Sequence, residues 1–135
     1  MENRKMKNTK NKRISPYNDQ ELEYFRQIII NKRSEAALEL ATLKSALQEE
    51  MENTTTKTTY SSHLADVGTD VRERDKIYIL LNRTQKFIRY LDRALERIEN
   101  KTYGLCKVTG KKILKGRLEA VPHTQLSIEA KRKQR

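Results

Sequence analysis

The sequence predicts a mainly α fold, in which a long antiparallel coiled-coil helical hairpin is followed by a small C-terminal module and a short terminal helix. Three observations support this prediction. Only two Pro and four Gly occur among the 135 residues, so few residues interrupt a helix. Two long segments place apolar residues at alternating steps of four and three, which is the spacing of a coiled-coil seam. Charged residues make up 35% of the chain, which is too polar for one compact globule of this length.

The predicted hairpin covers residues 16–102, with its tip near residues 60–70. Asn18 or Asp19 can cap the amino end of the first helix, because a short polar side chain accepts hydrogen bonds from unpaired helix N–H groups. The seam residues are Leu22, Phe25, Ile29, Ala36, Leu40, Leu43 and Leu47 in the first helix and Ile77, Leu81, Thr84, Ile88, Leu91, Leu95 and Ile98 in the second.

The region between the two seams is less regular. We expect the first helix to end at about Glu52. Residues 53–62 are rich in Thr and Ser, so they form either a loop or a weakly helical approach to the tip. Gly68 is the flexible point of this region, and Thr69 or Asp70 is expected to cap the second helix.

The net charge of +11 is concentrated at the two ends of the chain. Residues 1–14 carry six Lys or Arg against one Glu, and residues 107–135 carry nine Lys or Arg against two Glu. Cationic ends suit nucleic acid, a polyanionic nucleotide or an acidic protein surface. We interpret residues 1–15 as a basic disordered tail, because they lack helical periodicity. A solvated tail without a specific partner remains the alternative.

The sequence also indicates the cellular compartment. No apolar run approaches the ~20 residues that a membrane span needs, and no hydrophobic stretch follows the basic N-terminus as in a signal peptide. The single Cys106 cannot form an internal disulfide. We therefore expect a cytoplasmic protein, which acts as a monomer and has no membrane partner.

The C-terminal module, residues 103–135, resembles a known family. Residues 103–130 are similar to the zinc-finger module of the DksA/TraR family, whose pattern is YGxCxxCGxxIxxxRLxAxPxxxxCxxC. The matching residues are Tyr103, Gly104, Cys106, Gly110, Ile113, Arg117, Leu118, Ala120 and Pro122. The upstream hairpin also fits this family. The glycines of the module indicate short hairpin-like turns, and residues 125–134 are predicted to form a basic terminal helix.

The zinc-finger module is degenerate in this chain. The resemblance places the family's four zinc-binding cysteines at Cys106, Thr109, Ser127 and Ala130. A structural zinc ion needs four thiolate or imidazole ligands, and His123 would add only one. We expect no zinc and no other metal or cofactor. Cys106 is then either a small buried residue or a reactive thiol. A hydrophobic core is expected to replace the metal, formed by Tyr103, Leu105, Ile113, Leu114, Leu118, Val121, Leu126 and Ile128.

The resemblance implies a function. Members of the family insert the hairpin tip into the secondary channel of bacterial RNA polymerase, so it implies a transcription regulator that does not depend on specific DNA binding. Asp66, Gly68 and Thr69 fall on the family's tip element, and His63 falls where the family has an earlier acid. These four residues are the expected polymerase contacts. Asp66 and Thr69 as ordinary helix-start residues are the alternative.

The resemblance also implies a nucleotide contact. Arg83, Lys86 and Lys131 fall where related proteins contact the alarmone ppGpp at the polymerase interface, whereas Tyr90 stands where another basic contact is expected. A solvated cationic helix face, formed by Arg83, Lys86, Arg89 and Arg93, is the alternative.

Two other function classes are the alternatives. A nucleic-acid-binding protein that uses its cationic termini is the second hypothesis, although the sequence holds no intact helix-turn-helix or zinc-finger reader, so we expect no sequence-specific DNA binding. An enzyme is excluded by the lack of a nucleophile–base pair, a carboxylate pair held in a pocket or a phosphate loop. The two histidines, His63 and His123, lie in different parts of the chain.

Overall fold

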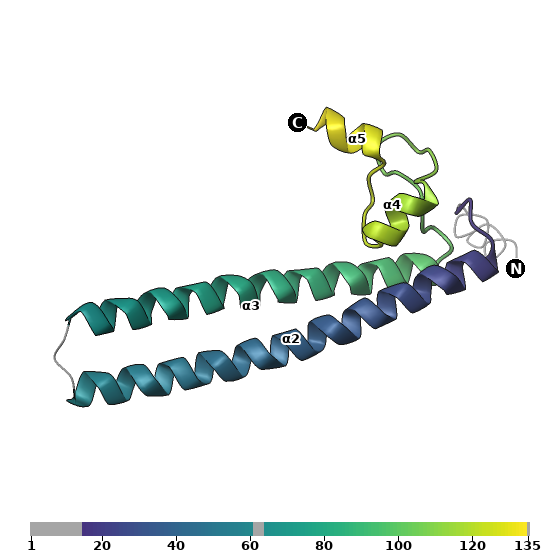
Figure 1. Cartoon of the computed structure of the whole chain (residues 1–135). Coiled ribbons are helices and arrows are strands. Elements are labelled where there is room, and N and C mark those ends of the chain that lie inside the picture. The colour runs from purple at the N-terminus through teal and green to yellow at the C-terminus, as the bar shows by residue number, and fades with distance from the viewer. Residues whose placement is uncertain (1–14, 61–63, 135) are drawn as a thin grey trace, which may run out of the picture. The chain divides into compact units, whose positions relative to one another are not determined.

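The computed structural model describes residues 15–60 and 64–134, with side chains given for residues 15–53 and 71–134. Helices α2 (Asp19–Tyr60) and α3 (Leu64–Glu99) are long, and α4 (Lys115–Ala120) and α5 (Ile128–Lys133) are short (Figure 1). Within these ranges the only β pairing is an isolated antiparallel bridge between Leu105 and Lys112. The prediction of a mainly α fold is therefore confirmed. None of the described helices is long and apolar enough to cross a membrane.

The described residues divide into two compact units. Residues 34–89 form one unit, and residues 15–33 together with 90–134 form the other. Within the unit of residues 34–89, α2 and α3 run antiparallel to each other (Figure 1). Ala36, Leu81 and Thr84 are buried there, and they occupy predicted seam positions. The alternating four–three spacing thus identified the faces that the two helices bury.

The ends of the helices near the tip differ from the prediction. Helix α2 continues past Glu52 to Tyr60, which favours the helical alternative for this stretch. Helix α3 already begins at Leu64, so the prediction that Thr69 or Asp70 caps it is wrong. Gly68 lies inside the helix and not at a turn. The physical reason is cooperativity, because each residue added to an existing helix gains a hydrogen bond that offsets the weak propensity of Thr or Gly.

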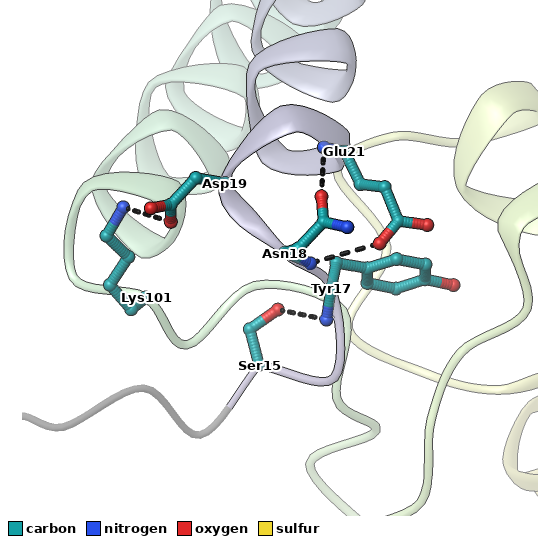
Figure 2. Close-up of polar contacts among 6 residues, drawn as sticks. All are labelled: Ser15, Tyr17, Asn18, Asp19, Glu21 and Lys101. Carbon is teal, nitrogen blue, oxygen red and sulfur yellow. Dashed lines mark hydrogen bonds and ion pairs between the residues drawn. The ribbon is translucent and has the colours of Figure 1, made fainter.

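Helix α2 begins with a reciprocal cap (Figure 2). The N–H of Glu21 donates to Asn18 Oδ1 at 2.8 Å, and the N–H of Asn18 donates to Glu21 Oε1 at 3.0 Å. Two helix-start N–H groups are satisfied in this way, the arrangement called a capping box. Of the two candidates for the cap, the structure selects Asn18, while Asp19 accepts a hydrogen bond from Lys101 Nζ at 2.9 Å.

Helix α3 ends in a Schellman motif. The N–H of Thr102 donates to the carbonyl of Arg97 at 2.8 Å, and the N–H of Lys101 donates to the carbonyl of Ile98 at 3.1 Å. The motif needs a residue in the left-handed region after the helix, usually glycine. Here Lys101 occupies it with φ of 63°. The carbonyl of Lys101 accepts from the N–H of Ser15 at 2.9 Å, which fixes the chain just before α2.

An aromatic cluster forms the core of the unit that contains the C-terminal module. The Phe25 ring centroid lies 5.2 Å from that of Tyr17 and 5.4 Å from that of Tyr103. The Tyr103 hydroxyl donates to the carbonyl of Pro122 at 2.7 Å, and burial raises the pKa of Tyr103. Other buried residues of this unit are Leu22, Ile29, Leu91, Ala94, Ile98, Cys106, Ile113, Leu118 and Ala130.

The predicted replacement core is only partly correct. Tyr103, Ile113 and Leu118 are buried, and Leu105, Val121 and Leu126 are half-buried. Leu114 is 67% exposed and Ile128 is 44% exposed, so their assignment to the core is wrong. Each stands at the start of a short helix, Leu114 as the residue before α4 and Ile128 as the first residue of α5. Both therefore lie where the chain turns at the surface.

Candidate functional site

The residues expected at the tip belong to the first turns of α3. Asp66, Gly68 and Thr69 are helical there, and their side chains lie outside the described set. His63 lies outside the described residues altogether. An acid in the first turn of a helix is favoured by the positive end of the helix dipole. Asp66 and Thr69 are three residues apart, so they share one face of α3.

The three residues expected to contact ppGpp fall into two groups. Arg83 and Lys86 are exposed on α3 in the unit of residues 34–89, three residues apart on one face. Lys131 is exposed on α5 in the other unit. The structure therefore groups Arg83 with Lys86.

Lys131 belongs to a cationic groove of about 710 Å³. The groove is also lined by Tyr90, Arg93, Lys107, Arg117, Val121, His123, Thr124, Gln125 and Leu126. Four of the lining residues are cations and none is an acid. Such a concentration of one charge attracts anions. Sequence reasoning identified Lys131 but not the two partners that the fold adds, Lys107 and Arg117. The excess of basic residues after position 106 was the only signal for them.

A pair of stacked rings forms part of the groove. The rings of Tyr90 and His123 have centroids 5.8 Å apart and planes only 7° apart. The backbone carbonyl of His123 accepts from Arg97 Nη2 at 3.2 Å. Burial, followed by the positive charges of Arg97 and Lys32, lowers the pKa of His123. The imidazole is therefore neutral near pH 7, and the positive charge of the groove comes from Lys and Arg alone.

Arg117 holds one wall of the cationic groove in place. Its Nε donates to the carbonyl of Leu126 at 2.7 Å, and its Nη2 lies 3.3 Å from Thr124 Oγ1. These bonds tie α4 to the segment that precedes α5. Arg117, which matches the family pattern, thus holds two segments of the module together. Sequence spacing did not indicate this role.

The four degenerate zinc positions converge in the fold. The N–H of Thr109 donates to Cys106 Sγ at 3.5 Å, and the N–H of Ala130 donates to Ser127 Oγ at 3.2 Å. Burial raises the pKa of the Cys106 thiol, but hydrogen bonds from Thr109 and Ser127 outweigh it and lower the pKa to about 6. One thiol, two hydroxyls and a methyl group do not fit a structural zinc ion, which needs four thiolate or imidazole ligands.

Comparison with known proteins relates the chain to one family. Residues 101–135 match the family described as the prokaryotic dksA/traR C4-type zinc finger. The chain is 37% identical over 113 residues to the RNA polymerase-binding transcription factor DksA of Caulobacter vibrioides, covering 84% of this chain and 75% of the relative. The chain belongs to the DksA/TraR family. The DksA of Escherichia coli K12 is 26% identical over 84% of this chain and 71% of its own length.

A solved structure of a DksA/TraR family member has the same fold. The transcription factor DksA2 from Pseudomonas aeruginosa superposes with a TM-score of 0.70 at 29% identity, covering 84% of this chain and 81% of that one. The likeness therefore extends over the long helices as well as the C-terminal module. These relatives are transcription factors by name. The chain is accordingly a member of a transcription-factor family and not an enzyme.

Proposed function

We propose that this protein binds bacterial RNA polymerase and regulates transcription by inserting its hairpin tip into the secondary channel. The main support for this function is the 37% identity, over 84% of the chain, to a protein named as RNA polymerase-binding. The similarity includes the two helices as well as the C-terminal module. A regulator that acts through the polymerase in this way needs no specific DNA binding of its own.

The tip has the chemistry for such a contact. Asp66 lies in the first turn of a 36-residue helix, which can carry its carboxylate into a narrow passage. In a confined site of low dielectric, a carboxylate accepts strong hydrogen bonds from cationic or backbone donors. Gly68 and Thr69 follow on the same segment, and Gly68 allows close approach of a partner's backbone. His63 is the fourth proposed contact.

The cationic groove supports ppGpp as a second partner at the polymerase interface. Arg93, Lys107, Arg117 and Lys131 line it without a compensating acid, as a polyphosphorylated nucleotide requires. The polymerase would complete this site. Arg83 and Lys86 would add to the cationic surface offered by α3. Tyr90, which stands where a basic contact was expected, stacks on His123, so the four cations of the groove would bind the phosphates.

We also propose that the C-terminal module keeps its fold without zinc. The buried rings of Tyr17, Phe25 and Tyr103, together with Ile113 and Leu118, form the kind of core that replaces a metal cross-link. Cys106 is itself buried within this core.

The experiment combines purified polymerase with the full chain and with the variant Asp66→Asn. We expect the variant to bind polymerase while losing most of its effect on transcription, because the amide keeps the shape of the carboxylate but not its charge. Asp75→Asn is the matched control, since Asp75 is an exposed acid on the same helix. Failure of the wild-type chain to bind polymerase would refute the proposed function. Unaltered regulation by Asp66→Asn would refute only the role of Asp66.

The nucleotide is tested separately. Transcription is measured with and without ppGpp for Lys131→Ala and, as control, Arg132→Ala, a neighbouring cation that does not line the groove. We expect only Lys131→Ala to reduce the response to ppGpp. Tight binding of duplex DNA in a gel-shift at moderate salt without polymerase would instead favour the nucleic-acid-binding alternative.

A further inference from the structure

Two exposed apolar side chains face a second groove of the C-terminal module. Leu114 is 67% exposed and Ile128 is 44% exposed, and both line a groove of about 200 Å³. The other lining residues are Lys111, Lys112, Arg117, Ser127 and Glu129. An isolated exposed leucine needs no explanation, but two apolar side chains in one hollow form a surface suited to a partner.

Local structure holds the walls of this groove. Leu114 has an extended backbone (φ −66°, ψ 148°) and directly precedes α4. Ser127 caps α5 by accepting a hydrogen bond from the N–H of Ala130 at 3.2 Å. Arg117 joins the two walls by donating from Nε to the carbonyl of Leu126 at 2.7 Å. A partner would therefore meet a surface that is already ordered, which lowers the entropy cost of binding.

The charge of the rim selects the kind of partner. Lys111, Lys112 and Arg117 line the groove against the single acid Glu129. The carboxylate of Glu129 lies 3.7 Å from Lys133 Nζ, so its charge is offset. A groove lined by two apolar side chains and three cations is complementary to an acidic segment that carries an apolar side chain.

The size of the groove argues for a peptide segment over a small molecule. Small-molecule sites usually enclose roughly 300–1,000 Å³, whereas this groove has about 200 Å³. A hollow of this size suits one bulky apolar side chain inserted from a longer chain. The basic rim would then contact acidic residues beside that side chain.

We propose that the groove between Leu114 and Ile128 docks an acidic segment of RNA polymerase, with one bulky apolar side chain of that segment inserted between them. This proposal rests on the proposed function and adds to it. The C-terminal module makes its own contact with the enzyme, separate from the contact made by the tip. In this contact the partner covers Leu114 and Ile128.

The first test measures the affinity of the full chain for purified RNA polymerase holoenzyme. The double variant Leu114→Ser with Ile128→Ser is expected to bind at least about tenfold more weakly, since it removes both apolar anchors of the contact. Val108→Ser is the matched control. Val108 is 62% exposed in the same module but does not line the groove, so its replacement should leave the affinity unchanged. Equal affinities for the double variant and Val108→Ser would overturn the proposal.

The second test leaves the apolar residues in place and changes the rim. Lys111→Glu is compared with Arg132→Glu, an equal change of charge on α5 outside the groove. Lys111 is chosen over Lys112, because the Lys112 ammonium lies 4.9 Å from the centroid of the Tyr17 ring. We expect Lys111→Glu to weaken binding several-fold more at low salt than at high salt, and Arg132→Glu to weaken it less. A larger effect of Arg132→Glu would contradict a docking role for this rim.

Two outcomes separate this proposal from the proposed function. If the wild-type chain binds polymerase and every groove variant binds equally well, only the docking groove is refuted. If the wild-type chain does not bind polymerase, both are refuted. Light scattering covers one further case. Dimers of the wild type that disappear in the Leu114→Ser, Ile128→Ser variant, with unchanged affinity for polymerase, would identify a second copy as the occupant and overturn the proposal.

Discussion

The ring of Tyr17 lies directly against the α-carbon of Gly104. A β-carbon at position 104 would lie 2.7 Å from both Cδ2 and Cε2 of this ring. The Tyr17 hydroxyl donates to the carbonyl of Ile113, and the N–H of Ile113 donates to the carbonyl of Gly104 at 2.8 Å. This closed set of contacts joins the segment before α2 to the first turn of the C-terminal module.

We predict that Gly104→Ala destabilises the protein by about 2–4 kcal/mol, because the added methyl group collides with a buried ring and φ of 92° is strained for any residue with a β-carbon. The free energy of unfolding, measured by urea denaturation of both proteins, tests this. A loss of only about 1 kcal/mol, the cost of the backbone strain alone, would mean that Tyr17 moves aside freely.

Two other glycines separate the collision from the backbone strain. Gly110 has φ of 72° with open space around its α-carbon, and Gly116 lies in α4 with open space and no positive φ. Gly110→Ala should therefore cost about 1 kcal/mol from strain alone. Gly116→Ala should stabilise by about 0.4–1 kcal/mol, because it reduces the freedom of the unfolded chain.

The local part of this fold could be predicted from the sequence. The heptad spacing gave the buried faces of both long helices, and the Asn18 cap is visible because its partner Glu21 is three residues away. Tyr17 was not recognised as a core residue. It follows a basic, aperiodic segment, and the residues it packs against, such as Gly104, come from a distant part of the chain. Pattern reading detects such long-range contacts poorly, since they leave no periodicity.

In the candidate sites too, the sequence predicted some features and missed others. The family pattern located Cys106, Thr109 and Ser127 in sequence, and the fold brings them together. Hydrophobicity alone predicted a buried Leu114, but a residue just before a short helix lies where the chain turns at the surface. The excess of basic residues after position 106 did not show that Lys107 joins Lys131 in one groove, because that depends on how the chain folds between them.

Lys101 offers a test of the helix end. It adopts φ of 63° at the position of the Schellman motif where glycine is preferred. We predict that Lys101→Gly is more stable to urea than Lys101→Ala by about 1 kcal/mol, since both lose the lysine side chain and only alanine retains the left-handed strain. The ion pair with Asp19 joins two partly exposed groups and should contribute less than about 1 kcal/mol. Equal stabilities of the two variants would contradict the strain.

Stability should fall in mild acid because of His123. Burial and the charges of Arg97 and Lys32 lower the pKa of His123 below its ordinary value of 6.5. As the pH falls below about 6.5, the unfolded chain binds a proton at His123 more readily than the folded chain does. Protonation therefore stabilises the unfolded state relative to the folded state until the pH falls below the folded pKa. The loss of stability between pH 7.5 and pH 5.5 should therefore be smaller in His123→Gln. Replacement of the other histidine, in His63→Gln, is the control, and an equal acid sensitivity of all three proteins would exclude the effect.

Restoring the missing cysteines should create a zinc site. Thr109 and Ser127 already hydrogen-bond to Cys106, and the N–H of Ala130 lies 3.2 Å from Ser127 Oγ. The triple variant Thr109→Cys, Ser127→Cys, Ala130→Cys thus supplies four thiolates at converging positions, as a tetrahedral structural zinc requires. We expect one zinc per chain in this variant by metal analysis and a melting temperature that falls when a chelator removes the metal. The wild type, with only one of the four ligands, should contain no stoichiometric zinc and should melt at the same temperature with or without chelator. Stoichiometric zinc in the wild type would show that other donors complete the site, and zinc-free triple variants would show that the four positions do not converge closely enough.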